Sequence, residues 1–367
     1  MKAISLTPGT SRVSLIERPE PHISSPDEIK IKVLQVGICG TDREEASGGR
    51  ADAPVGSNEL ILGHEMFGQV VEVGSEVTVV KQGDFGVFTV RRGCNKCKAC
   101  LNGRSDMCYT GQYKERGIKG LDGFQAEFVV DKEKYIVKVP SRISDIGVLT
   151  EPLSVAEKAI VEAVNIQKLR LPGLSEEDDW LKGKTAFVAG LGPIGLMAAL
   201  ILILRGAEVV GMDVVDHDSP RPEILKRMGG KYLDGRKINA LELDLKIGQI
   251  DLIFEGTGVA DLEFKLIDAL GINGIYILSG IPGGSAETCI SGAELLRQMV
   301  LKNQVMIGCV NAGIEHYRLA VEDLDKAKEK WGELVNDIIT EKFSFKNFDK
   351  ALFNHSKNDI KVVIDWT

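Results

Sequence analysis

The sequence lacks a long hydrophobic run. Its longest apolar stretch, Leu196 to Leu204, is far shorter than the ~20 residues of a membrane-spanning helix, and Arg205 ends it. The first residues, Met1 to Leu6, also lack the apolar core and the small-residue cleavage site of a secretory signal. We therefore expect no membrane association and a cytoplasmic location.

The sequence also has no excess of positive charge. It has 45 Lys and Arg residues against 53 Asp and Glu residues, a net charge of −8, and no extended basic run. A protein that holds a phosphate backbone needs a basic patch, so we expect no nucleic-acid partner. Hydrophobic residues make up 44% and charged residues 27%, which excludes a disordered or fibrous chain. A length of 367 residues predicts about two domains.

Cysteine is scarce but unevenly placed. There are seven cysteines, an odd number, and five of them lie between Cys39 and Cys108. This distribution indicates metal or thiol chemistry in a reducing compartment and argues against a disulfide framework.

Four of these cysteines have the spacing of a single metal-binding loop: Cys94, Cys97, Cys100 and Cys108. Such spacing lets a loop surround one tetrahedral Zn²⁺. An iron–sulfur cluster is the alternative, but Tyr109 stands where the bacterial cluster pattern has proline. Because four sulfur ligands leave no position for a substrate, we expect a structural zinc site.

A second set of possible ligands precedes this loop. Cys39 and His64 offer a thiolate and an imidazole, and the third ligand is either Glu65 or the distant Glu151. Three protein ligands and one open position are typical of catalytic zinc. Taken singly, such a cysteine is more often a buried apolar residue and such a histidine a satisfied core residue. The set together favours a second zinc ion.

A Gly-x-Gly-x-x-Gly pattern stands between a predicted strand and a predicted helix, formed by Gly190, Leu191, Gly192, Pro193, Ile194 and Gly195. The pattern suits a pyrophosphate bound at a helix N-terminus, although a plain glycine-rich turn has the same spacing. The next strand ends at Asp213, where an acidic residue binds the adenosine ribose hydroxyls. A carboxylate there repels a 2′-phosphate, and no Arg or Lys follows before Arg221, so we expect NAD in preference to NADP. The alternative is a merely solvated carboxylate.

Small and polar residues follow the later strands, where ligands gather in sheets of this kind. We expect cofactor contacts from Thr257, Leu278, Ser279, Gly280, Ile281, Val310 and Asn311. Ordinary turn chemistry is the alternative for these positions.

The pattern of elements changes once along the chain. Short β-rich runs up to about Pro140 predict a small β-barrel, and residues 151–168 predict a helix. Alternating strands and helices from Thr185 to Cys309 then predict a parallel sheet with helices on both faces. A charged helix over residues 317–336 and two short strands follow. We expect residues 1–152 and 313–367 to form one discontinuous domain and residues 153–312 the other.

The motifs in this order resemble the zinc-dependent medium-chain dehydrogenases over essentially the whole chain. They are Gly37-Ile38-Cys39-Gly40-Thr41-Asp42, Gly63-His64-Glu65, the four-cysteine loop and Gly190 to Gly195. Five further segments resemble the archaeal-type glucose dehydrogenases. They are Val90-Arg91-Arg92-Gly93-Cys94, Glu115-Arg116-Gly117-Ile118, Asp122-Gly123-Phe124, Glu151-Pro152-Leu153-Ser154 and Gly308-Cys309-Val310-Asn311. The resemblance implies an α/β fold with a GroES-like β-barrel catalytic domain and a Rossmann doubly wound parallel-sheet domain.

The resemblance also implies residue roles. Cys39 and His64 hold the catalytic zinc, and Glu65 and Glu151 share the remaining carboxylate roles, directly or through water. Thr41, Glu115, Glu151 and Asn311 contact the substrate, and Thr41 relays its proton. This sequence has Val90 and Val155 where some relatives place sugar-binding side chains, so the sugar stays open. Relatives that use NADP have an Asn or Gly followed by two arginines after the second strand. This sequence has Asp213-Val214-Val215 there, which supports NAD.

The implied activity is hydride transfer from C1 of a glucose-like aldose to a nicotinamide cofactor, giving an aldonolactone, with two zinc ions per chain. A polyol (sorbitol-like) or secondary-alcohol dehydrogenase is the nearest alternative, and a non-catalytic dinucleotide-binding protein is an alternative of another class. The resemblance further implies a homodimer or homotetramer joined through the dinucleotide domains, for which residues 272–278 are a candidate edge strand.

Overall fold

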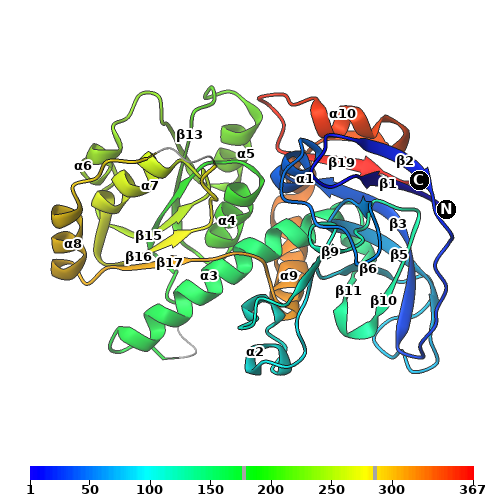
Figure 1. The fold of residues 1–367 in the computed structure, drawn as a ribbon. Coiled ribbons are helices and arrows are strands. Elements are labelled where there is room, and N and C mark those ends of the chain that lie inside the picture. The colour runs from blue at the N-terminus through cyan, green and yellow to red at the C-terminus, as the bar shows by residue number, and fades with distance from the viewer. Residues whose placement is uncertain (176–178, 284–286) are drawn as a thin grey trace. The chain divides into compact units, whose positions relative to one another are not determined.

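The computed structural model describes residues 1–175, 179–283 and 287–367. The chain divides into two compact units. The first consists of Met1–Ser154 together with Asn311–Thr367, and the second of Val155–Val310. In Figure 1 the blue-to-cyan and red parts of the chain belong to the first unit, and the yellow part belongs to the second.

The first unit is built on a seven-stranded sheet with the order β11-β6-β5-β3-β19-β18, in which β10 also pairs with β3. Its central strand, β3, pairs with three strands and buries Ile29, Ile31 and Val33 completely. The strands are β3 (Glu28–Ile38), β5 (Glu65–Val73), β6 (Phe85–Phe88), β10 (Phe128–Lys132), β11 (Ile136–Val139), β18 (Ile339–Ser344) and β19 (Lys361–Asp365).

The end of the chain completes this sheet. β19 runs antiparallel to β3, with Val362 opposite Ile38 and Val363 opposite Gly37. The first unit is therefore assembled from both ends of the sequence, and β19 lies beside the residues that precede Cys39.

Two three-stranded sheets and four helices complete the first unit. The sheets have the orders β2-β1-β4 and β7-β8-β9. Their strands are β1 (Lys2–Leu6), β2 (Val13–Glu17), β4 (Leu60–Ile61), β7 (Arg91–Arg92), β8 (Lys114–Arg116) and β9 (Gly120–Leu121). The helices are α1 (Gly40–Ala46), α2 (Lys98–Leu101), α9 (Ile314–Trp331) and α10 (Phe348–Phe353).

The helix α9 is shorter than the sequence predicts. It ends at Trp331 because Gly332 takes a left-handed φ of 58°, and a 3₁₀ segment, Gly332–Ile338, follows. Another helix, α3 (Thr150–Arg170), begins in the first unit and continues in the second.

The second unit is a six-stranded parallel sheet with the order β14-β13-β12-β15-β16-β17. This is the doubly wound order, which places the crevice at the ends of β12 and β15 where the order reverses. The strands are β12 (Thr185–Ala189), β13 (Glu208–Asp213), β14 (Lys231–Asp234), β15 (Ile250–Glu255), β16 (Leu270–Leu278) and β17 (Val305–Gly308). The expected fold class, including this sheet, is confirmed.

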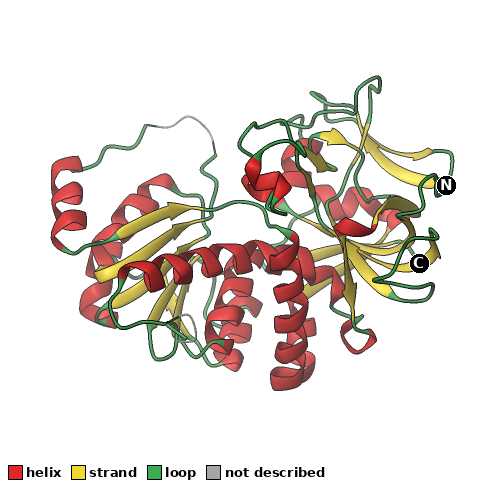
Figure 2. Ribbon diagram, turned by 90° about the horizontal axis from the view of Figure 1, so that it is seen from below, coloured by secondary structure: helices red, strands yellow, loops and turns green. Residues whose placement is uncertain are grey.

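Helices accompany the parallel strands, and Figure 2 shows them in red beside the yellow sheet. They are α4 (Pro193–Leu204), α5 (Pro220–Met228), α6 (Leu243–Ile247), α7 (Ala260–Leu266) and α8 (Gly292–Leu301). Every α4 residue from Gly195 to Leu202 is buried, which explains why its sequence is apolar on all sides. No described helix combines the length and the hydropathy needed to cross a bilayer.

The prediction that residues 272–278 form an edge strand is wrong. These residues belong to β16, which pairs with β15 on one side and β17 on the other. Within the described residues, β17 is the strand at that edge of the sheet.

Candidate metal centres and dinucleotide site

The structure brings three of the four predicted catalytic-metal ligands together. A ligand atom of each of Cys39, His64 and Glu65 lies within 4.8 Å of the other two. Cys39 is the N-cap of α1, and His64 and Glu65 lie where the chain enters β5. Gly63, at φ 88°, makes the preceding turn; a Cβ there would meet Gln125 and Val36 at 2.6 and 2.9 Å. The glycine thus lets His64 approach Cys39.

Asp42 organises this cluster from α1. Its Oδ2 accepts a hydrogen bond from the Cys39 backbone N–H at 2.8 Å, and its Oδ1 lies 3.5 Å from Nδ1 of His64. Burial opposes ionisation of Asp42, but His64 and these hydrogen bonds hold the pKa of Asp42 below its usual value. Burial alone would lower the pKa of His64, but Asp42 and Cys39 hold it well above its usual value. Protons therefore compete with a metal ion for His64.

Lys361 is a site residue that the sequence pattern did not reveal. Its Nζ lies 2.7 and 2.6 Å from the two carboxylate oxygens of Glu65, and both side chains are buried. Gly37 makes room for this pair, because a Cβ there would overlap Oε2 of Glu65. Lys361 begins β19, so the sheet pairing of the chain's end brings it to Glu65. The sequence signals it only weakly, by a lysine that directly precedes the apolar run Val362 to Ile364.

Glu151 lies near the cluster but outside the set of three. It stands in the first turn of α3, and its side chain is buried. Burial raises the pKa of Glu151 to about 7, with a further contribution from the Glu65 carboxylate. A carboxyl group with that pKa exchanges its proton readily near neutral pH. Thr41, the remaining predicted catalytic residue, donates its backbone N–H to Sγ of Cys39 at 3.3 Å.

The donor set of the cluster fits zinc. One thiolate, one imidazole and one carboxylate are ligands that Zn²⁺ prefers, and three protein ligands leave a position for substrate. Cys39 and His64 with Glu65 or Glu151 would hold the ion.

The four predicted loop cysteines also meet. Sulfur atoms of Cys94, Cys97, Cys100 and Cys108 lie within 4.8 Å of one another. The Thr110 hydroxyl and backbone N–H groups lower the pKa of the Cys94 thiol to about 5, which favours a thiolate. Four sulfur donors in this arrangement fit a tetrahedral zinc ion.

The predicted substrate residues Glu115 and Asn311 are in direct contact. Nδ2 of Asn311 donates to Oε1 of Glu115 at 2.8 Å. Asn311 takes a left-handed φ of 62°, which asparagine tolerates better than most residues. This places two polar groups of the kind that bind sugar hydroxyls side by side in the first unit.

In the second unit, the glycine pattern turns tightly into α4. Gly190 has φ 84°, and a Cβ on Gly195 would overlap the Gly190 carbonyl. Gly192 is the N-cap of α4 and Pro193 its first residue, so free N–H groups stand at the helix start, where a pyrophosphate binds.

A cavity of about 370 Å³ adjoins this turn. Of the predicted cofactor residues, Gly190, Gly192, Asp213 and Thr257 line it. The other predicted cofactor residues do not line it: Pro193, Ile194, Gly195, Leu278, Ser279, Gly280, Ile281, Val310 and Asn311. Asn311 belongs to the first unit. The cavity corresponds in its position on the sheet to an adenosine site.

Asp213 is not a freely solvated carboxylate. Its Oδ2 accepts the backbone N–H of Leu191 at 2.9 Å, and Nη1 of Arg221 lies 3.3 Å from the same oxygen. Arg221 also lines the cavity, so the cavity holds a paired acid and base at the end of β13.

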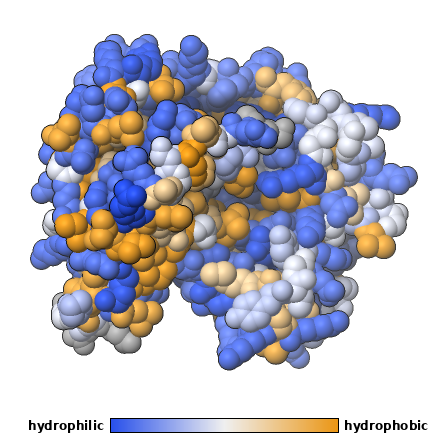
Figure 3. All heavy atoms as spheres, turned by 60° about the vertical axis from the view of Figure 1, so that its left-hand side comes forward, coloured by the Kyte–Doolittle hydropathy of each residue, from blue (hydrophilic) through white to orange (hydrophobic). Residues whose placement is uncertain are grey.

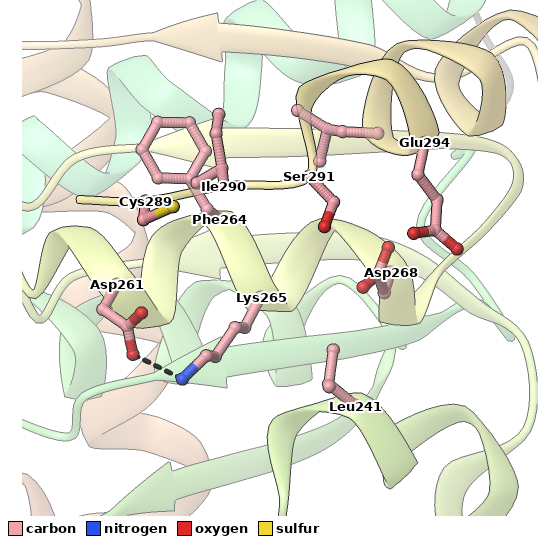
Figure 4. Close-up of a pocket in the computed structure, with 10 residues that line it drawn as sticks. Leu241, Asp261, Phe264, Lys265, Asp268, Cys289, Ile290, Ser291 and Glu294 are labelled. Carbon is pink, nitrogen blue, oxygen red and sulfur yellow. Dashed lines mark hydrogen bonds and ion pairs between the residues drawn. The ribbon is translucent and has the colours of Figure 1, made fainter.

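A second hollow in this unit contains none of the predicted site residues. It encloses about 310 Å³ and includes the acidic side chains of Asp261, Asp268 and Glu294. Figure 4 shows Lys265 paired with Asp261 and the other two carboxylates facing the same space. Burial and the nearby Glu294 raise the pKa of Asp268.

A GroES-like barrel with a zinc-type donor set and a doubly wound dinucleotide sheet define a medium-chain dehydrogenase. Two family profiles agree with this class: the alcohol dehydrogenase GroES-like domain matches residues 25–141, and the glucose dehydrogenase C-terminus matches residues 144–366. The chain belongs to the glucose dehydrogenase family.

Several named relatives are similar to this chain over its full length. Glucose 1-dehydrogenase 2 of Vulcanisaeta moutnovskia is 37% identical, covering 100% of this chain and 99% of its own. Glucose 1-dehydrogenase of Thermoproteus tenax is also 37% identical, covering 99% of both chains. Among solved structures, Haloferax mediterranei glucose dehydrogenase in complex with NADP, Zn and gluconolactone matches with a TM-score of 0.88 at 31% identity, covering 100% of this chain and 99% of the other.

Proposed function

We propose that the chain oxidises C1 of glucose or a similar aldose to the lactone and reduces a nicotinamide cofactor. The observation that carries the proposal is the cluster of Cys39, His64 and Glu65, which offers the ligands of a catalytic zinc in a family of glucose dehydrogenases. Full-length similarity to proteins named glucose 1-dehydrogenase supports the substrate class.

Zinc at this cluster would make a substrate hydroxyl more acidic, and the nicotinamide would accept the hydride. Thr41 and Glu151 are our candidates for moving the proton, because Thr41 adjoins Cys39 and the pKa of Glu151 is about 7. Glu115 and Asn311 would bind sugar hydroxyls. Lys361 holds Glu65 in place.

For the cofactor we propose NAD as the better substrate and NADP as a weaker one. Asp213 lies in the cavity, where its carboxylate suits the 2′-hydroxyl of NAD and repels the 2′-phosphate of NADP. Arg221 partly offsets that repulsion, which is why NADP is not excluded. The position of Gly190 to Gly195 before α4 suits the pyrophosphate of either cofactor.

We further propose a homodimer or homotetramer joined through the second unit. Its edge strand β17 has unpaired backbone groups on one side within the described residues, and α8 exposes Leu296, Val300 and Leu301. Figure 3 brings the α8 side of Figure 1 forward and shows hydrophobic side chains gathered among polar ones. A cytoplasmic location is proposed because four adjacent thiols need a reducing compartment.

The metal cluster is tested by replacing His64 with alanine. We expect His64→Ala to abolish glucose oxidation, to lose one of two zinc ions per chain and to keep the fold, because the four-cysteine loop is untouched. Turnover, zinc content and circular dichroism check these points. Normal turnover in this variant would show that the proposed catalytic cluster is wrong.

A further inference from the structure

Arg91 connects the four-cysteine loop to Glu115. It lies on β7 directly opposite Glu115 on β8 and is buried. Its Nε and Nη2 donate to Oε1 of Glu115 at 3.0 and 2.8 Å. Its Nη1 donates at 2.8 Å to the backbone carbonyl of Asp106, which lies in the loop between Cys100 and Cys108.

The guanidinium of Arg91 has little freedom to move. It stacks on the ring of Tyr113 at 3.9 Å from the ring centroid. Asp106 is itself fixed, because its buried carboxylate accepts from Arg104 at 2.7 Å. The planar guanidinium is therefore held by a ring on its face and by acceptors at its edges.

The consequence is seen at the Glu115 carboxylate. Its Oε1 receives Arg91 and also Asn311 at 2.8 Å. Among the described residues, no side chain or backbone group donates to its Oε2. One oxygen is thus saturated by protein donors, and the other is left able to accept a hydrogen bond from a ligand hydroxyl.

We propose that Arg91 is a positioning residue for sugar specificity, which orients Glu115 so that its Oε2 binds one particular hydroxyl of the sugar. The anchor of this arrangement is the Asp106 carbonyl of the four-cysteine loop. This inference rests on the proposed aldose oxidation and adds a residue that does not itself touch the substrate.

The test compares three variants. Arg91→Lys keeps the charge but loses the two-sided hydrogen bonding of the guanidinium. Glu115→Gln identifies which sugar hydroxyl Glu115 recognises. Arg92→Lys is the matched control, because Arg92 is also buried, pairs with Asp131 at 2.7 Å and stacks on Tyr135 at 3.8 Å without a hydrogen bond to Glu115.

For each variant, kcat and KM are measured with D-glucose and a set of monodeoxyglucoses that keep the C1 hydroxyl, and KM is measured for NAD. Thermal unfolding is recorded in parallel. We expect Glu115→Gln to lose the preference of the wild type for glucose over one deoxyglucose. Arg91→Lys should lose the same preference, with about a tenfold or greater rise in KM for glucose and an unchanged KM for NAD.

Arg92→Lys should lower thermal stability and keep the preference. If Arg91→Lys keeps the preference, or if Arg92→Lys loses it as well, Arg91 is a structural residue and the inference is overturned. Absence of aldose oxidation in the wild type would instead overturn the proposed function and this inference together.

Discussion

Glu45 is a buried acid whose carboxylate has no hydrogen-bond partner among the described residues. Its side chain is fully buried in α1. Burial, with a contribution from Asp42, raises the pKa of Glu45 from 4.5 to about 8. Between these two pH values, Glu45 therefore keeps its proton in the folded chain and releases it in the unfolded chain.

This difference predicts a pH-dependent stability. Below pH 4.5 both states are protonated, and as the pH rises toward about 8 ionisation increasingly favours the unfolded chain. Glu45→Gln should therefore match the wild type near pH 4.5 and exceed it at pH 8, by on the order of a few kcal/mol. Denaturant unfolding at both pH values measures the free energy of unfolding. Glu44→Gln is the control, because the Glu44 side chain is half-exposed. An equal effect of Glu45→Gln at both pH values would contradict the raised pKa.

Unlike Glu45, the buried carboxylate of Glu65 has a partner, because it forms an ion pair with Lys361. Lys361→Met leaves the Glu65 carboxylate buried and unpaired, which typically costs about 3–5 kcal/mol. The double variant Lys361→Met/Glu65→Gln removes both charges and should be less destabilised than Lys361→Met alone. Thermal unfolding of both variants tests the pair. Additive losses would show that the two side chains do not interact.

Among the elements, the end of β13 and the first turn of α5 meet at the cavity that is proposed to hold the adenosine ribose. The Asp213–Arg221 ion pair joins these two elements. The proposed preference for NAD would then be a property of the pair and not of Asp213 alone.

Asp213→Asn should release Arg221 and remove the repulsion of a 2′-phosphate. We expect kcat/KM for NADP relative to NAD to rise about tenfold or more, and Asp213→Asn/Arg221→Gln to lose that gain. Steady-state rates with both cofactors measure it, with Asp216→Asn as a control outside the cavity. A gain that survives in the double variant would show that Arg221 does not bind the phosphate.

The order and type of the elements were predictable, because local patterns determine them. The alternation of strands and helices begins with a strand at Thr185, and the next strand ends at Asp213, as predicted. The edge position assigned to residues 272–278 was wrong because strand order depends on pairings that a local pattern does not contain.

Contacts between distant segments account for what the sequence did not reveal at the site. Lys361 meets Glu65 across 296 positions of sequence, and Asn311 meets Glu115 across 196. Metal-ligand spacing predicted the four cysteines, because they lie in one loop. No spacing rule predicts a lysine that arrives from the other end of the chain, or the bond from Arg91 to a loop carbonyl.

In the molecule as a whole, the proposed reaction would need both units, because one holds the metal cluster and the other the dinucleotide cavity. That reaction is the oxidation of an aldose with NAD. The most direct test is the initial rate of reduced-nicotinamide formation by zinc-replete protein with D-glucose and NAD, measured beside sorbitol and beside NADP. We predict a clear rate with glucose and NAD, a lower rate with NADP and none with sorbitol. Activity on sorbitol without activity on glucose would contradict the claim and identify a polyol dehydrogenase instead.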